Sequence, residues 1–463
     1  MASSVLEGQT PTTAKGYLSS FIDVTRRMSP TSAAGIISAR CMDYDDVAWA
    51  KGDEIFAPWR SLIFEPEVLR DIGRFIDKHR GGVPDELFFP KRGSFNAWLR
   101  THFEDGGSTV IRLPCPGASL FPEEKVKREV AVMQFLEYFT NLRIHYILHH
   151  GMTEESPRSL GPFIIMEHFS NEGDFIDAIN TPGRSRDDRP VLDPNVSQER
   201  LEFVYGQMAD IMLQVSKYSL LIRGASSYYQ ALAEMHMIHL SCQRNDAIDS
   251  AEDCRQKFIA RCLFRKIARE HQLSKDETGP FKLFCDDLRP GNVLANKDHV
   301  MTGMVDWEFT YVAPTGFAYS APFWLLLELP ELYEDGLDAW TRKYEELLPI
   351  FLKALKGRER AAIERGTIQE TDCLSKHMLD SWESGEFWLN YAERKSWAFD
   401  MIYWAKIDRR FFGDGDLDDR IQLLTTEERE EMEGFVQMKL KMKEEGGLAE
   451  VENTKSETMG ALA

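Results

Sequence analysis

CDDLRPGNVLANKDHVMTGMVDWEF, residues 285–309, is the most informative part of this 463-residue sequence. An apolar run leads into an acidic loop and Pro-Gly. A strand then starts at Asn292, turns at 296–298 and returns as a strand that ends in Asp306. This order predicts that Asp287, Asn292 and Asp306 lie at the ends of neighbouring strands, where their side-chain oxygens converge.

Two interpretations of these residues compete. Asp and Asn beside Pro-Gly are good turn formers, and Asp306 could simply cap a turn. We favour a functional site because all three side chains are embedded in apolar strands, where a polar group without a purpose is costly. Phosphoryl transfer needs one carboxylate near the acceptor hydroxyl, and an Asn and an Asp that hold Mg²⁺ on the nucleotide phosphates.

A family resemblance is carried by the same residues. "CDDLRPGNVL…GMVDWEF" resembles the catalytic and metal-binding loops of the aminoglycoside phosphotransferase (phosphotransferase enzyme) family, and the resemblance covers residues 90 to 330. The blocks 243–268 and 381–413 are similar to its fungal-type branch. The resemblance implies a protein-kinase-like fold, a catalytic base at Asp287, and metal ligands at Asn292 and Asp306. The sequence has no D-F-G or A-P-E, which argues against a protein kinase.

The resemblance also indicates how a nucleotide, ATP or GTP, would be bound. The family's phosphate-contacting lysine aligns with Arg112, and its carboxylate partner is expected at Glu129 on the helix predicted over 123–139. Arginine keeps the charge but is longer and planar. An ordinary surface strand residue is the alternative for Arg112. The family's histidine before the base is Cys285 here, a position expected to brace the loop.

Two further segments are expected to contact the nucleotide. Without a G-x-G-x-x-G, the covering loop is assigned to a glycine-led turn, for which a plain hairpin is an equal alternative. The hinge is expected where backbone groups would meet the purine ring. The turn comprises Gly93, Ser94, Phe95 and Asn96, and the hinge comprises Met166, Glu167 and His168.

The acceptor side is less well defined. Asp286 is expected to brace the loop, and Glu308 to support the metal site. Arg289 is expected either to steady the transferred phosphate or the acceptor, or to pair with a neighbouring carboxylate. Acidic residues would suit a cationic or polyhydroxyl acceptor if they formed a wall, although a solvated helix face explains most of them. These are Glu328, Glu331, Glu334, Asp335, Asp338, Asp400 and Asp408. The aromatic residues between 382 and 404 are expected in the core.

Periodicity predicts an α+β, two-lobed architecture. We expect an N-terminal extension at 1–60, disordered in part, an N-lobe with a small antiparallel sheet and one prominent helix at 61–168, a mostly helical C-lobe at 169–440, and a disordered tail at 441–463.

Composition excludes several functional classes. With 55 Lys and Arg against 75 Asp and Glu, the formal charge is −20, which argues against nucleic-acid binding. We see no apolar run long enough to span a membrane. Seven scattered cysteines without C-x-x-C spacing favour neither a disulfide framework nor zinc. A cytoplasmic location is expected, although residues 1–41 faintly resemble a mitochondrial transit peptide.

The sequence therefore predicts a Mg²⁺-dependent phosphotransferase that acts on a hydroxyl of a small molecule. The rival hypothesis is a catalytically inactive relative that binds a nucleotide or acts as a scaffold. Cys285, Arg112 and the glycine-poor loop motivate this rival.

Overall fold

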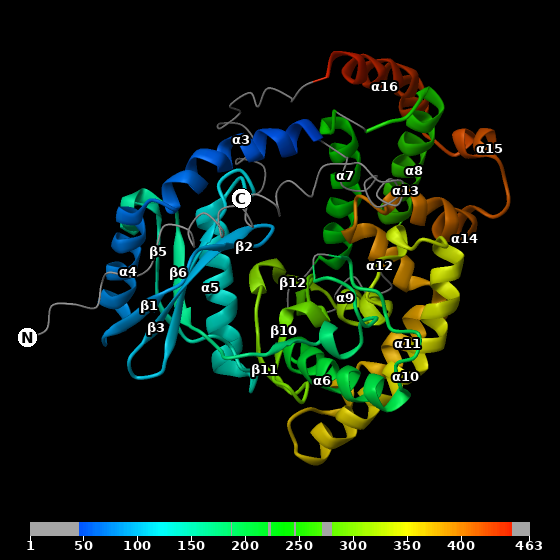
Figure 1. Cartoon of the computed structure of the whole chain (residues 1–463). Helices are drawn as coiled ribbons and strands as arrows, with labels where there is room; N and C mark the ends of the chain where they lie inside the picture. The colour runs from blue at the N-terminus through cyan, green and yellow to red at the C-terminus, as the bar shows by residue number, and fades with distance from the viewer. Residues whose placement is uncertain (1–45, 187, 221–223, 245–246, 271–279, 447–463) are drawn as a thin grey trace, which may run out of the picture. The chain divides into compact units, whose positions relative to one another are not determined.

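The structure, a computed structural model, describes residues 46–186, 188–220, 224–244, 247–270 and 280–446 (Figure 1). Cys41 and residues 1–41, on which the transit-peptide comparison depends, lie outside these ranges.

The N-lobe is built on an antiparallel sheet with the order β1-β3-β4-β6-β5. The short strand β2 pairs with Ala97 and Trp98 of β3. One helix, α5, connects β4 to β5. The bounds are α3 Asp46–Ile63, α4 Pro66–Arg80, β1 Pro84–Leu87, β2 Lys91–Arg92, β3 Asn96–Phe103, β4 Ser108–Pro114, α5 Pro122–Phe139, β5 Ile147–Gly151 and β6 Phe163–Glu167.

Both faces of this sheet are covered, because its strands alternate between two apolar clusters. Ile111 and Ile165 pack with Ile72 of α4, whereas Val110 and Ile164 belong to the cluster that contains α5. A hairpin at Asp105-Gly106-Gly107 joins β3 to β4. Gly106 adopts a φ of 84° there, which favours glycine.

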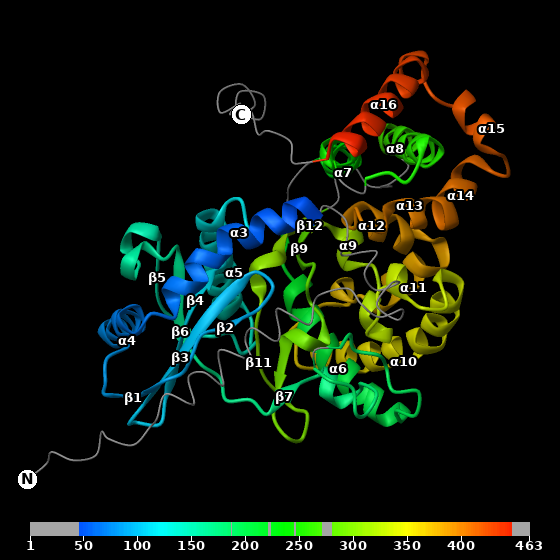
Figure 2. The same cartoon turned by 45° about the horizontal axis from the view of Figure 1, so that its top comes forward.

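The C-lobe is mostly helical (Figure 2). α6 packs on α10, and α7 and α8 lie side by side with α16 against α8. The bounds are β7 Gly173–Asp174, α6 Gln198–Ser216, β8 Ser219–Leu220, α7 Ala225–Cys242, α8 Ala251–Arg269, β9 Phe281–Cys285, β10 Val293–Ala295, β11 Met301–Met304, β12 Thr310–Pro314, α9 Thr315–Ala318, α10 Leu337–Glu364, α11 Ser375–Ser384, α12 Glu386–Arg394, α13 Phe399–Ile402, α14 Asp408–Phe412, α15 Leu417–Gln422 and α16 Thr426–Glu445.

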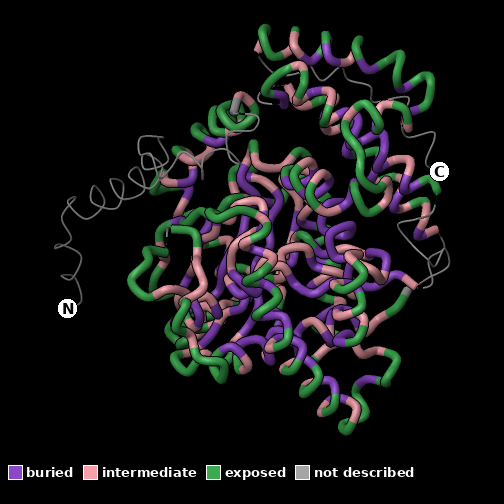
Figure 3. The backbone as a smooth tube through the Cα atoms, turned by 90° about the vertical axis from the view of Figure 1, so that its right-hand side faces the viewer, coloured by how far each residue is buried: buried purple, intermediate pink, exposed green. Residues whose placement is uncertain are grey.

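Buried residues follow the inner sides of these elements, while α16 is exposed along much of its length (Figure 3). The aromatic block is mainly core, as predicted: Trp388, Phe399 and Tyr403 are buried, although Trp397 is exposed.

Two small antiparallel sheets of the C-lobe position the informative loops. β10 lies between β11 and β7, and β9 lies between β12 and β8. The predicted strand pair around the turn at 296–298 is therefore confirmed.

The expected fold class is also confirmed. An antiparallel sheet with one connecting helix is followed by a mostly helical region, and this order of elements is that of a protein-kinase-like fold. Among the described residues, no helix combines the length and apolar character needed to cross a membrane.

Candidate active site

The loop after β9 holds Asp287 next to Asn292. The side-chain amide of Asn292 donates to the backbone carbonyl of Asp287 at 2.7 Å and to its carboxylate at 2.9 Å. Because the amide nitrogen is used in this way, Oδ1 of Asn292 is the atom left to coordinate a cation.

The antiparallel pairing of β10 with β11 carries the chain at Asp306 back towards Asn292. Val293 lies opposite Met304, and the N–H of Val305 donates to the carbonyl of Asn292 at 3.0 Å. Asp306 follows directly, with a φ of 62° that is uncommon for a residue other than glycine. The structure therefore brings the side chains of Asp287 and Asn292 into contact and places Asp306 close enough for its charge to raise the pKa of Asp287.

The donor atoms of this group fit a magnesium ion. Asn292 and Asp306 supply amide and carboxylate oxygens, the ligand types that Mg²⁺ prefers. The described residues contain no group of three His, Cys, Asp or Glu side chains placed to hold a metal. A metal at this point would thus rely on the asparagine together with carboxylates.

Arg112 connects this group to the N-lobe. Its guanidinium forms an ion pair with Glu129 of α5, lies 2.8 Å from the Asp306 carboxylate and lies 3.4 Å from Glu308. Burial acts to lower the pKa of Arg112, but the carboxylates of Glu129, Asp306 and Glu308 raise it above its ordinary value, so the side chain stays charged. Arg112 is buried, which excludes the surface-residue alternative.

Glu308 contacts more charged and polar side chains of the site than the supporting role expected from the sequence requires. Its side chain is only 3% exposed and lies 2.5 Å from the ammonium group of Lys125. Asn96 donates to the same carboxylate at 3.2 Å and accepts from Lys125 at 3.1 Å. Sequence reasoning did not identify Lys125. Its position one turn before Glu129 on α5 was the available signal.

The predicted covering loop is the tight turn between β2 and β3. The N–H of Gly93 donates to the carbonyl of Asn96 at 2.8 Å, so a hairpin is present. Phe95 packs edge-on against Phe309 of the C-lobe, with ring centroids 5.3 Å apart. Ser94 and Phe95 line a cavity of about 200 Å³ shared with α3.

The predicted hinge has fewer free backbone groups than expected. The N–H groups of Glu167 and His168 donate to the carbonyls of Tyr146 and Ser108, and the carbonyl of Glu167 already contacts His145 at 2.6 Å. Met166 is buried within the sheet. His168 is half-buried, and burial lowers its pKa to about 4, so the imidazole is neutral.

Asp287 and Asp286 face different partners. The carboxylate of Asp286 accepts from Tyr311 at 2.6 Å and from Arg394 at 2.5 Å. Asp287 instead pairs with Arg289 at 2.8 Å. Burial raises the pKa of Asp287 above its ordinary value, although Arg289 and Asn292 act to lower it.

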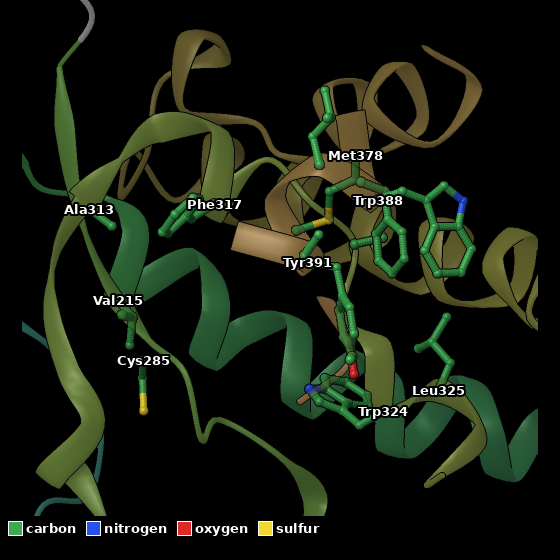
Figure 4. Packing of buried hydrophobic residues seen from close by; sticks show 14 of the residues in the cluster. Val215, Cys285, Ala313, Phe317, Trp324, Leu325, Met378, Trp388 and Tyr391 are labelled. Atoms are coloured by element: carbon green, nitrogen blue, oxygen red, sulfur yellow. The ribbon is translucent and has the colours of Figure 1, made fainter. Parts of the chain in front are cut away.

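Cys285 is the last residue of β9 and is buried in a large cluster of apolar side chains (Figure 4). Burial raises the pKa of its thiol to about 12, so the thiol is neutral and packs as a small apolar group. A cavity of about 50 Å³ adjoins it, lined in part by Asp286, Phe317 and Arg394.

Two of the acidic residues considered for an acceptor wall are used elsewhere. Asp400 pairs with Arg261, and Asp408 pairs with Arg420, so both carboxylates are used inside the helical core. Glu331 is a different case, because its carboxyl group accepts from Tyr391 at 2.7 Å and burial raises its pKa.

Comparison with known proteins gives weak similarities only. No family model matches the chain, and no curated protein matches it. Among solved structures, the ADP-bound aminoglycoside phosphotransferase APH(2'')-Ib is 12% identical, with a TM-score of 0.43 over 81% of this chain and 98% of that one. The Plasmodium vivax ethanolamine kinase is 13% identical, with a TM-score of 0.44 over 80% and 89%. Amicoumacin kinase hAmiN, in complex with AMP-PNP, Ca²⁺ and Ami, is 9% identical, with a TM-score of 0.41 over 83% and 95%.

Proposed function

We propose that this chain is an ATP- and Mg²⁺-dependent phosphotransferase that moves the γ-phosphoryl group to a hydroxyl of a small molecule. The observation that carries the proposal is the side-chain hydrogen bond between Asn292 and Asp287, together with the backbone hydrogen bond from Val305 to Asn292 that puts Asp306 next in the chain. GTP is an alternative donor, and the resemblance to the fungal-type branch belongs to the same proposal.

Each residue has a role that its contacts support. Asp287 orients the acceptor hydroxyl and takes its proton as the acceptor oxygen bonds to the γ-phosphorus and the bond to the β–γ bridging oxygen breaks. Asn292 and Asp306 would hold Mg²⁺, which neutralises phosphate charge when bound. Arg112, held by Glu129, lies beside Asp306 and supplies positive charge to the phosphates.

The N-lobe and the C-lobe contact each other beside Arg112. Glu308 comes from the C-lobe, whereas Asn96 and Lys125 come from the N-lobe. This contact supports assigning the turn 93–96 to the phosphate side of the site, where the N–H of Gly93 is already used within the turn and a nucleotide would meet the remaining backbone groups.

One observation favours the rival function. Arg112 is surrounded by three carboxylates, one of which is the proposed metal ligand Asp306. A protein that kept this arrangement with nucleotide bound would bind without transferring phosphate.

The test is an untargeted search for phosphorylated metabolites with the purified chain, Mg²⁺ and ATP, beside the Asp287→Asn variant. We expect transfer that the variant loses by about 10²–10⁴-fold, the usual contribution of a general base. A Mg²⁺-dependent thermal shift with ATP should persist in the variant. Binding without transfer over the whole metabolite set would support the rival.

A further inference from the structure

Arg112 is held between three carboxylates that differ in their exposure. The side chains of Glu129 and Glu308 are each 3% exposed, whereas the side chain of Asp306 is 40% exposed. Arg112 itself is buried. A cation that enters from solvent therefore reaches Asp306 before the other two carboxylates, and it meets the guanidinium of Arg112 there.

The guanidinium bridges two of these groups with different nitrogen atoms. Nη1 of Arg112 donates to Glu129, and Nη2 donates to Oδ1 of Asp306 at 2.8 Å. A guanidinium can make two such contacts at once because its donors are fixed in a planar fork, whereas an ammonium group is a compact point charge. Arginine at position 112, where the family resemblance expects lysine, thus gives Asp306 a cationic partner within the chain.

This partner competes with a metal ion, because Asp306 is also the carboxylate assigned to Mg²⁺. Arg112 already takes Oδ1, and a divalent ion on the other oxygen of the same carboxylate would lie close to the guanidinium, which repels it. The second assigned ligand, Asn292, is neutral and cannot offset this repulsion. A metal ion on its own must displace Arg112 or bind weakly beside it.

Nucleotide phosphates would remove this obstacle. Their oxygens are negatively charged and accept from a guanidinium as a carboxylate does. When Arg112 turns from Asp306 to a phosphate, its ion pair with Glu129 can remain, and the Asp306 carboxylate becomes free for the metal ion. Phosphate on Arg112 and metal on Asp306 then favour each other, and such coupling is reciprocal.

We propose that Arg112 is the internal counter-ion of the cation site: it occupies Asp306 while the nucleotide is absent, so that a divalent ion binds tightly only together with the nucleotide. The inference rests on the proposed phosphotransferase function and adds a coupled order of binding to it. It also makes the carboxylates around Arg112 compatible with transfer, because the contact with Asp306 is the one that nucleotide binding releases.

The experiment measures Mn²⁺ binding to the purified full chain, without nucleotide or acceptor, by the electron paramagnetic resonance signal of free Mn²⁺. Mn²⁺ takes the same oxygen ligands as Mg²⁺. The test variant combines Arg112→Gln with Glu129→Gln, so the buried Glu129 carboxylate is not left unpaired and the net charge of the cluster is unchanged. We expect this double variant to bind Mn²⁺ at least about ten-fold more tightly than wild type, because the metal no longer competes with a charge-assisted hydrogen bond.

Two further variants locate the effect. Adding Asp306→Asn to the double variant should abolish the gain. Lys125→Gln removes a positive charge from the same cluster, but Lys125 pairs with Glu308 and Asn96, so this variant should gain much less Mn²⁺ affinity than the double variant.

Three outcomes would overturn the inference while leaving the phosphotransferase intact: an unchanged Mn²⁺ affinity in the double variant, an equal gain in Lys125→Gln, or a gain that survives Asp306→Asn. Absence of transfer in the metabolite search would instead refute the phosphotransferase itself, because the Mn²⁺ titration contains neither nucleotide nor acceptor.

Discussion

Replacing Glu308 by Gln tests the contact that joins the two lobes. Glutamine keeps the volume and can still accept from Asn96, but it removes the negative charge 2.5 Å from Lys125 and 3.4 Å from Arg112. Arg112 retains Glu129 and Asp306, so the loss falls mainly on Lys125, which is 13% exposed. Removing one partner of a buried ion pair costs about 3–5 kcal/mol, and we expect about 3 kcal/mol because Lys125 keeps Asn96.

Urea denaturation followed by tryptophan fluorescence measures this cost. Glu334→Gln is the control, because Glu334 is exposed and its replacement should change the free energy of unfolding by less than about 0.5 kcal/mol. Adding Lys125→Met to Glu308→Gln should recover part of the loss, since replacing both charges leaves neither unpaired. A loss below about 1 kcal/mol for Glu308→Gln, or none beyond the control, would refute the argument.

Three further predictions concern the active site and the core. The value of kcat/KM should fall as pH drops through the pKa of Asp287, which burial raises above 3.8. Arg289→Gln should move this acidic limb of the pH profile to higher pH, because Arg289 lowers the pKa of Asp287. An acidic limb that does not move in the variant would contradict the pairing of Asp287 with Arg289. Asp306→Asn should lose the Mg²⁺-dependent thermal shift with ATP, and Asp306→Ala should be about 1 kcal/mol less stable than Asp306→Asn, because both variants lose the ion pair with Arg112 but Asn tolerates the left-handed backbone that Ala does not. Burial raises the pKa of Glu393 well above 4.5, and neither carboxyl oxygen has a hydrogen-bond partner among the described residues, so the stability that the protonated group gives is present below pH 4.5 and is lost as pH rises through the folded pKa. Glu393→Gln should therefore be more stable than wild type at pH 8, and equal stability in urea at pH 8 would refute this.

Local patterns of the sequence were sufficient for most of the fold. Val68, Ile72 and Ile76 of α4 have the apolar spacing of an amphipathic helix, and Asp105-Gly106-Gly107 between β3 and β4 has the composition of a hairpin turn. The order of residues from Asp287 to Asp306 predicted which side chains meet, because a short hairpin fixes their separation. These features depend on neighbours in the chain, which periodicity reports directly.

Contacts between distant segments could not be predicted in the same way. Asn96 and Glu308 are far apart in the chain, so no local pattern shows that their side chains meet. For the same reason the sequence could not tell that Asp400 pairs with Arg261 or that Lys395 lies 3.8 Å from Asp286. Charged residues at helical spacing predict that a helix face is exposed. Which residue pairs with each charge depends on contacts between distant segments, and these are known only from the fold.

The arginine at position 112 has a practical consequence for chemical labelling. Acyl-phosphate derivatives of nucleotides react with amines, and a guanidinium that stays protonated is a poor nucleophile. Such reagents should leave Arg112 unmodified even when bound. The amine that contacts the same cluster is Lys125, held by Glu308 and Asn96. If the proposed nucleotide binding holds, such reagents should modify this chain at Lys125 of helix α5 and not at Arg112 of strand β4.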